Sequence, residues 1–402
     1  MNSRILALCV SLLTLPVPLL ARAEGLSLEP LSEAVRAGEG RFAVRYRYEH
    51  VDQDGIDRDA NASTARARYT WRSADVDAWS FGFEADYVAM IGPERYNSTA
   101  NGETGYPVVA DPEGFDLNQA FVAYRNDALT LTGGRQRILH GNQRFVGGVG
   151  WRQNEQTFDA VRLESRVGAV ALDYAYVANV NRIFGPDDGV QPADWRSDSH
   201  LLRLDWPLSE GIRLGAFGYL MDFDNDNGPP NANATAGLEA QAQVGPVKLE
   251  ATIARQTDYA DNPQDYQAWY GRVEAAANIR RMTVTAGVEV LGSDAGTAAF
   301  RTPLATLHKF QGWADKFLNT PAAGIEDVYF GLAGRWDRLT ASVVYHELDS
   351  EQGDVDYGSE VDVALGYSLS PRVSAQLKAS DYDSDGFATD TRKLWLTVNV
   401  SL

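Results

Sequence analysis

Residues 41–49 read Arg-Phe-Ala-Val-Arg-Tyr-Arg-Tyr-Glu. Apolar and aromatic side chains alternate here with mostly charged ones, so an extended chain would carry an apolar face and a charged face. An alternation of period two predicts a β-strand that lies between two different environments. The same alternation returns along the whole chain, and its last run ends at Leu402.

The alternating runs number about 18, and because three of them are weak the true count could be about 16. They start near residues 41, 63, 79, 116, 128, 157, 170, 199, 212, 233, 247, 268, 282, 325, 339, 358, 373 and 391. The weak runs are those near 116, 233 and 268. Most runs are about 8 to 11 residues long, the length at which a tilted strand crosses an outer membrane.

The segments between the runs alternate between short and long. Arg125–Asp127 and Arg166–Ala169 are short, whereas Met90–Phe115, His140–Gln156 and Gly292–Gly324 are long and polar. An up-and-down membrane barrel has this arrangement, while both ends of a soluble β-sandwich face the same water. The sequence therefore predicts an all-β fold, a single transmembrane up-and-down antiparallel β-barrel with short periplasmic turns and long extracellular loops.

The N-terminus predicts export. Arg4, the apolar run from Ile5 to Leu20 and the small residues Ala21 and Ala23 are typical of a secretory signal peptide. After residue 23 no apolar stretch reaches the roughly 18 residues that a membrane helix needs. We expect a cleaved signal peptide at residues 1–23, a short periplasmic segment at 24–40 and the barrel at 41–402, in the outer membrane of a Gram-negative bacterium.

The composition excludes several classes of function. The 402 residues include 55 acidic and 36 basic ones, a formal charge of −19, whereas a nucleic-acid partner requires basic surface. The single cysteine, Cys9, lies in the expected leader, and none of the five histidines is paired with another at metal-ligand spacing. No nucleophile elbow or glycine-rich phosphate loop is present. We therefore expect no enzyme activity, no cofactor and no metal.

One acidic motif raises the question of calcium binding. Asp381, Asp383, Asp385 and Gly386 match the first half of a calcium-binding loop, but the position that needs a glutamate is Arg392. Aspartate-rich turns are common, so the motif favours an ordinary turn. Weak calcium bridging between outer loops and lipopolysaccharide stays open as an alternative.

Three segments carry a family resemblance. Residues 133–147 read GGRQRILHGNQRFVG, and residues 151–163 read WRQNEQTFDAVRL. Both resemble the alginate export family of outer-membrane barrels, and residues 310–317, FQGWADKF, are similar to the same group. The resemblance implies about 18 strands and a channel through the barrel. Members of such a group need not share one substrate.

The first two of these segments together include the third outer loop with its flanking strands. In many pores such a loop folds inward and narrows the channel, and here it would carry Arg144, Arg152 and Glu155. The alternative is that its polar side chains only satisfy backbone groups and brace the wall. Arg135 and Arg137 share strand parity with apolar residues, so inward placement would need a bulge or an early strand end.

Arginine is concentrated at positions that the alternation directs into the lumen. Guanidinium groups bind carboxylates bidentately and keep their charge, which suits transient capture of an anionic solute. The candidate pore-lining or substrate-binding residues are Arg41, Arg45, Arg47, Arg66, Arg68, Arg144, Arg152, Arg162 and Arg203. Acidic residues are also expected in the lumen, namely Glu84, Asp86, Asp173, Glu250, Glu289, Glu360 and Asp362, so the wall carries mixed charge.

These features predict an outer-membrane porin for passive or facilitated diffusion of small hydrophilic, anionic solutes such as sugar acids, oligouronates and organic acids. One alternative is an export conduit for an anionic polysaccharide such as alginate, which would work with a periplasmic partner. Another is an outer-membrane enzyme or adhesin that uses the barrel as a scaffold. The expected partners are outer-membrane lipid, lipopolysaccharide and small anionic or carbohydrate solutes.

Overall fold

The computed structural model describes residues 29–402 except residue 226. The expected leader at residues 1–23 therefore lies outside the described residues. A short helix, α2 (Glu29–Arg36), precedes the first strand. None of the described helices is long and apolar enough to cross a membrane.

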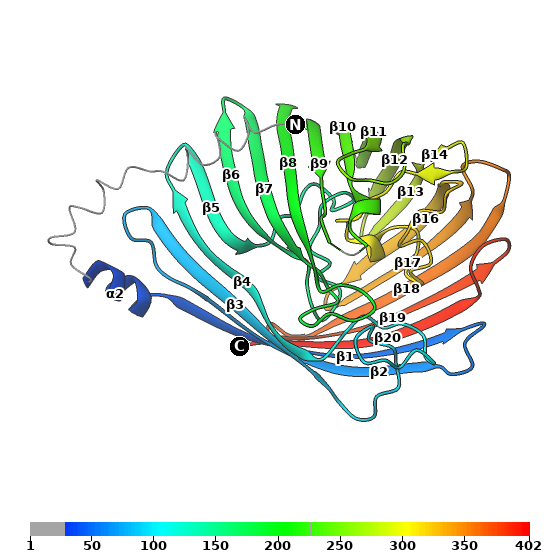
Figure 1. Ribbon diagram of the computed structural model, residues 1–402, viewed down its shortest axis with the longest axis horizontal. Helices are drawn as coiled ribbons and strands as arrows, with labels where there is room; N and C mark the ends of the chain where they lie inside the picture. Colours follow the sequence, from blue (N-terminus) through cyan, green and yellow to red (C-terminus); the bar gives the residue numbers. More distant parts are fainter. Residues whose placement is uncertain (1–28, 226) are drawn as a thin grey trace.

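Eighteen strands form one antiparallel sheet that closes on itself (Figure 1). The wall strands are β1 (Glu39–Gln53), β2 (Ala60–Arg72), β3 (Trp79–Met90), β4 (Gly114–Arg125), β5 (Leu129–Gln136), β6 (Thr157–Val167), β7 (Val170–Asn181), β8 (Asp194–Ser209), β9 (Ile212–Met221), β10 (Asn233–Val244), β11 (Val247–Asp258), β12 (Gln267–Ile279), β13 (Met282–Leu291), β16 (Ile325–Trp336), β17 (Leu339–Asp349), β18 (Asp356–Ser370), β19 (Val373–Ser384) and β20 (Thr391–Ser401). Each strand pairs with the next along the chain, and the two-stranded hairpin β14 (Ser293–Asp294) and β15 (Ala298–Ala299) lies in the connection between β13 and β16.

The barrel closes where its first and last strands meet. β1 pairs with β20 from Ala43 opposite Ser401 to Gln53 opposite Thr391. At the end of this seam, Phe42 and Leu402 exchange backbone hydrogen bonds of 3.4 and 2.8 Å. Closure leaves no wall strand with an unpaired edge, as a membrane barrel requires.

The strand count and the order of turns and loops agree with the prediction from the sequence. The weak runs near 116, 233 and 268 are β4, β10 and β12, and the largest difference in a start is at β8, which begins at Asp194 instead of near 199. Short turns such as residues 126–128 and 168–169 lie at one end, and long loops such as 91–113, 137–156 and 292–324 lie at the other. The predicted up-and-down barrel is confirmed.

The alternation places apolar side chains on the outside of the wall. Val161, Ile253 and Phe330 are 52%, 62% and 54% exposed, although none of them is polar. Such exposure is stable where the surrounding medium is hydrocarbon, so this face is the lipid-facing one. The intervening residues of each strand point into the barrel.

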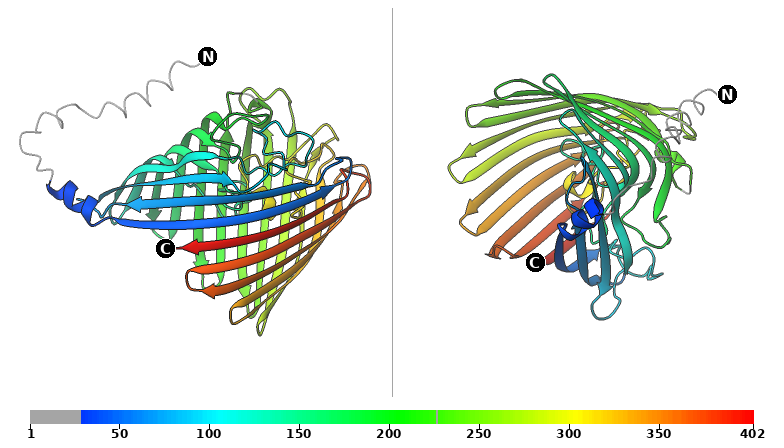
Figure 2. Two further views of the ribbon diagram at one scale, coloured as in Figure 1. Left: turned by 90° about the horizontal axis from the view of Figure 1, so that it is seen from below. Right: turned by 90° about the vertical axis from the view of Figure 1, so that its left-hand side faces the viewer.

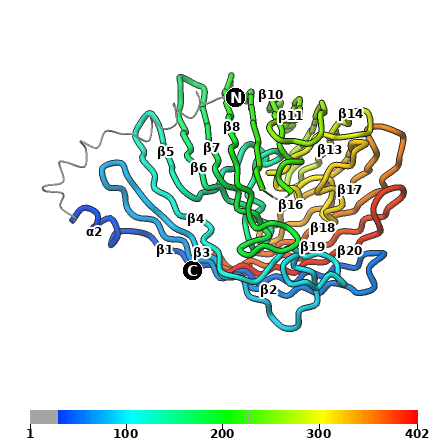
Figure 3. The backbone as a smooth tube through the Cα atoms, in the orientation of Figure 1, coloured from blue at the N-terminus to red at the C-terminus, as the bar shows by residue number. Residues whose placement is uncertain are grey.

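Two long loops fold into the barrel. The constriction loop (residues 137–156) and the inner loop (residues 292–324) meet there, where Val146 forms an isolated bridge to Leu304. Phe145 lies in a buried cluster with Phe217 on β9 and Tyr270 on β12, at ring-centroid distances of 4.6 and 5.1 Å. Figures 2 and 3 show the two loops crossing the space that the strands enclose. The interior is therefore partly filled by the chain's own loops.

Candidate functional site

The constriction loop reaches the middle of β1. Arg45 points into the barrel, and its Nη1 donates to the carbonyl oxygens of Gly150, Trp151 and Arg152 at 3.0, 3.4 and 3.2 Å. Its Nε donates to Asn399 on β20 at 3.1 Å. A single wall arginine therefore holds three successive carbonyl groups of the loop, and this contact fixes how deep the loop lies in the lumen.

Arg152 joins the wall and the two loops. Its Nη1 lies 2.9 Å from Glu49 on β1, and its Nη2 lies 3.3 Å from Asp315 in the inner loop. Burial lowers the pKa of Arg152, but the carboxylates of Glu49, Asp111 and Asp315 outweigh burial and raise it above its ordinary value. Arg152 is thus a permanent, buried cation whose partners lie on separate segments of the chain.

Glu155 is the matching anion of the constriction loop. It accepts from Arg68 at 2.6 Å and from Arg137 at 2.5 Å, and Arg66 lies 3.8 Å away. Burial raises the pKa of Glu155, but these guanidinium groups, Arg68 and Arg137 foremost, lower it to about 2. Glu155 is therefore ionised at any physiological pH, and it ties the loop to β2.

Arg137 points inward because β5 ends one residue before it, at Gln136. It donates to Glu155 and also to Glu84 on β3. Arg135, still on β5, instead pairs with Asp159 at 2.7 Å and donates to the carbonyl of Leu117 at 3.1 Å. Because β5 ends early, Arg137 can contact both Glu155 of the constriction loop and Glu84 of the wall.

The inner loop is anchored by a second buried arginine. Arg144 Nε lies 2.7 Å from Glu289 on β13, while Nη1 donates to Thr302 and Nη2 donates to Gln311, both at 3.1 Å. The Arg144 side chain is 1% exposed. One residue of the constriction loop therefore fixes two points of the inner loop to the wall.

Trp151 forms the centre of an aromatic and cationic stack. Its ring stacks on His308 at 4.5 Å, with the Arg47 guanidinium 4.1 Å and the Lys378 ammonium 3.8 Å from the Trp151 ring. Lys378 donates to His308 Nε2 at 2.8 Å, and His308 Nδ1 donates to Asp315 at 2.8 Å. Burial lowers the pKa of His308 to about 3, against the opposing effect of Asp315, so the imidazole is neutral.

The arginines of β6, β8 and β12 have different partners. Arg162 pairs with Asp173 at 2.5 Å, and Arg203 pairs with Glu239 at 2.6 Å. Arg272 pairs with Glu250 and Glu274 at 3.1 and 2.5 Å. These carboxylates lie on strands of the wall, so these three inward arginines are neutralised by the wall itself. We call the region from β6 to β12 the self-paired wall.

The nine predicted arginines thus fall into distinct places. Arg41 is 80% exposed at the start of β1 beside Glu39, and Arg162 and Arg203 lie on the self-paired wall. Six gather around the two loops, namely Arg45, Arg47, Arg66, Arg68, Arg144 and Arg152. Arg45 differs from the other eight because no carboxylate of a described residue lies within 4.0 Å of it. Their roles in solute binding stay predictions.

Several residues of the site were not singled out from the sequence. His308 and Lys378 both contact Trp151 of the constriction loop, and their loop and strand patterns gave no signal of that. For Arg137 the sequence allowed an inward position only with a bulge or an early strand end, and β5 does end early, at Gln136. Asp315 lies in the FQGWADKF segment that resembles the family, and this was the available signal for it. Pairings between loops depend on a three-dimensional path that alternation does not encode.

No group of three His, Cys, Asp or Glu side chains suited to a metal ion occurs in the part of the chain that the structure describes. Asp381, from the aspartate-rich motif, instead pairs with Arg392 at 3.0 Å on the outside of the wall.

The barrel fold is also found in solved structures. Pseudomonas aeruginosa OccK3 (OpdO) matches with a TM-score of 0.71 and 14% identity, over 94% of this chain and 99% of that one. P. aeruginosa OpdK, solved with vanillate, has a TM-score of 0.71 and 14% identity, over 92% and 99%. Acinetobacter baumannii OccAB4 has a TM-score of 0.70 and 14% identity, over 91% and 98%. At this identity the likeness establishes the fold, that of outer-membrane porins.

The sequence comparison is more specific. Curated proteins include no match to this chain. The alginate export family matches residues 41–291, which cover β1 to β13, the constriction loop and most of the paired arginines. This match includes more than half of the chain, and the predicted outer-membrane barrel of porin type is confirmed. The chain belongs to the alginate export family.

Proposed function

We propose that this barrel lets small carboxylated solutes, such as sugar acids and organic acids, diffuse across the outer membrane, and that it acts as a channel and not as an enzyme. The narrow part is the space beside the constriction loop. Residues 1–23 would be the cleaved leader, and residues 24–40 would lie in the periplasm. OpdK, which shares this fold, was solved with vanillate, a carboxylate, and this supports the proposed solute class.

The observation that carries the proposal is the environment of Arg45. Its guanidinium donates to three loop carbonyls and one asparagine, all uncharged groups, so its positive charge is not neutralised by a contacting carboxylate. Arg66 lies directly opposite on β2, and its carboxylate neighbour, Glu155, is 3.8 Å away. An uncompensated cation inside a narrow, low-dielectric passage raises the local concentration of anions.

Export of a polymer is a weaker interpretation of the same geometry. Two loops occupy the lumen and are fixed by buried ion pairs at Arg144 and Arg152. A polysaccharide strand would need a continuous wide path, whereas a small solute needs only the space beside the loops. The loop anchors therefore favour diffusion of small molecules.

Planar-bilayer recordings under a salt gradient test the proposal. The wild-type channel is expected to prefer anions, and Arg45→Gln to bring the anion-to-cation permeability ratio close to one, since it removes the uncompensated charge. The double variant Arg203→Gln/Glu239→Gln is the matched control, because it removes a pair whose charges already cancel. The effect should be larger at low salt, where screening is weak. Equal reversal potentials for wild type and Arg45→Gln would overturn the proposal.

A further inference from the structure

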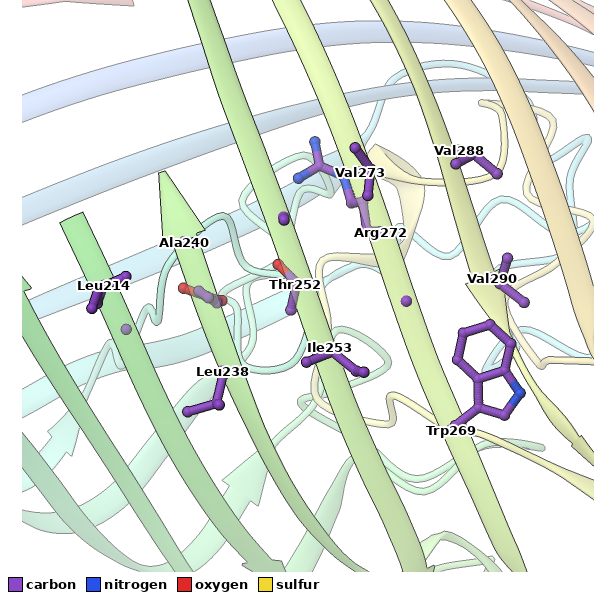
Figure 4. A pocket seen from close by; sticks show the side chains of 14 residues that line it. Leu214, Leu238, Ala240, Thr252, Ile253, Trp269, Arg272, Val273, Val288 and Val290 are labelled. Carbon is purple, nitrogen blue, oxygen red and sulfur yellow. The ribbon is translucent and has the colours of Figure 1, made fainter. Parts of the chain in front are cut away.

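The outer wall carries a long hollow over strands β8 to β13. It consists of three adjoining parts with volumes of about 690, 710 and 600 Å³. The first two parts share Ala236 and Arg255, and the last two share Leu238, Ile253 and Trp269. Figure 4 shows the third part, with Leu238, Ile253 and Trp269 on successive strands. We call this continuous hollow the outer groove.

Small residues between larger ones create the outer groove. Ala236 lies opposite Gly218 on β9, and Ala240 lies opposite Ala251 on β11. A Cβ atom added at Gly218 would meet no other atom within 4 Å. The floor of the groove is therefore backbone and methyl groups, and its sides are branched and aromatic side chains. This shape and chemistry suit an extended acyl chain.

Arg255 lies at the outer end of the groove and faces the membrane. It has the same strand parity as Ile253, which is 62% exposed on the lipid side. Its side chain is exposed and forms no ion pair or hydrogen bond with the side chains and backbone that the structure describes. A cation on the lipid-facing side of a strand is costly unless it reaches the headgroup level or an anion accompanies it.

The position of Arg255 along the membrane normal indicates where that anion would lie. Arg255 is three residues from the outer end of β11 and lies opposite Trp269 on β12. Tryptophan is enriched at the level of lipid headgroups. The groove runs inward from this level, so its polar end lies at the headgroups of the outer leaflet and its apolar part lies among the acyl chains.

We propose that the outer groove binds one phosphorylated glycolipid of the outer leaflet, lipopolysaccharide, with a phosphate on Arg255 and an acyl chain along Gly218, Ala236 and Ile253. A guanidinium binds phosphate bidentately, and this pairing neutralises Arg255 without help from the protein. The polar side chains of His200 and Thr257 line the same outer end and face the headgroup. The charge of Arg255 and the apolar groove behind it together match an anionic amphiphile.

Retention of lipopolysaccharide tests the inference. Wild type and variants are extracted in mild detergent, incubated with rough lipopolysaccharide and examined by native mass spectrometry. Wild type is expected to hold one copy. Arg255→Gln and Gly218→Leu are each expected to weaken retention, the former by about tenfold because a charge-assisted pair is lost. In the second variant the added side chain would extend into the groove from a Cβ that meets no other atom within 4 Å, so this variant should still fold.

Two control variants separate the groove from the rest of the wall. Arg392→Gln removes another outward arginine, one that Asp381 already neutralises at 3.0 Å. Ala379→Leu enlarges a lipid-facing residue of β19, on another part of the barrel. Both should retain lipopolysaccharide as wild type does. Undiminished retention by Arg255→Gln, equal binding of dephosphorylated glycolipid, or a dimer whose loss accompanies Gly218→Leu would each overturn the inference.

Discussion

The walls on the two sides of the lumen use arginine differently. On β1 and β2, Arg45, Arg66 and Arg68 each donate to the constriction loop, and Arg68 also donates to Asp86 on β3. On the self-paired wall, Arg162 and Arg203 direct theirs to carboxylates of the wall itself. The same residue type at the same kind of strand position therefore anchors a loop on one side and stiffens the sheet on the other.

This difference shows that the identity of a lumenal residue does not determine its task. A loop that enters the barrel brings carbonyl groups and carboxylates with it, and the nearest arginines pair with these groups first. Where no such segment lies against the wall, acidic residues on neighbouring strands take that place. Among the nine predicted arginines, the one without a carboxylate of a described residue within 4.0 Å is Arg45, to which the loop offers uncharged acceptors.

The largest effect should come from removing an ion pair that holds the two loops against the wall. Arg152→Met removes the cation shared by Glu49 and Asp315 and leaves both carboxylates buried. Losing one partner of a buried ion pair costs about 3–5 kcal/mol. We expect the loops to loosen, single-channel conductance to rise and the folded barrel to melt at a lower temperature in a gel-shift assay.

The matched change on the self-paired wall is Arg162→Met. Arg162 and Asp173 are both partly exposed to the lumen, so solvent screens the loss and conductance should change little. Equal changes in conductance for the two variants would contradict the distinction between the walls.

A smaller effect should follow from acidification. The pKa of His308 is lowered to about 3 by burial, so its contribution to stability is complete above its ordinary pKa of 6.5 and is lost as the pH falls toward 3. Glu155, with a pKa of about 2, keeps its charge over this interval. Conductance of the wild type should therefore become noisier as the pH falls from 6.5 toward 3, as the inner loop loosens.

His308→Gln checks this assignment, because a glutamine keeps a donor and an acceptor but does not titrate. Recordings of this variant should change less over the same pH interval. An unaltered pH profile would show that another group is responsible.

The smallest effect concerns the pairing of β4 with β5, which lies between β1 and β2 on one side and the self-paired wall on the other. β4 pairs with β5 only from Ala120 to Arg125, and Gly134, opposite Phe121, lies one residue inside this limit with φ +115°. A Cβ at Gly134 would lie 2.3 Å from the carbonyl oxygen of Ala120, whereas one at Gly133 would meet nothing within 4 Å. We expect Gly134→Ala to cost about 1–3 kcal/mol of unfolding free energy in urea titrations, and Gly133→Ala clearly less. Similar losses would refute a special role for Gly134.

The sequence was sufficient to predict the barrel because its physics is local. Alternation of period two, loops that differ in length between the two ends, and strands of membrane-crossing length each follow from short stretches, and all 18 strands were located from them. Even the weak runs near 116, 233 and 268 proved to be strands, since their neighbours on both sides supply pairing.

The site was less predictable because its contacts join distant segments. Arg152 meets Asp315, which is 163 residues away, and Arg144 meets Gln311 at a similar separation. Alternation indicated that Arg45 and Arg66 face the lumen but not that a loop lies against them. The outer groove was unpredictable for the same reason. Strand parity directs Gly218 and Ala236 outward, but it does not show that the hollow between them is continuous.

The seam between β1 and β20 has a consequence for how the molecule is made. Its hydrogen bonds join side chains as far apart as Arg45 and Asn399, 354 positions along the chain. Contacts of such long sequence separation form slowly, because the entropy of bringing the ends together is lost before the contact is gained. Early in folding the sheet therefore has two unpaired edges, and the pairing of β1 with β20 is expected to be among the last steps.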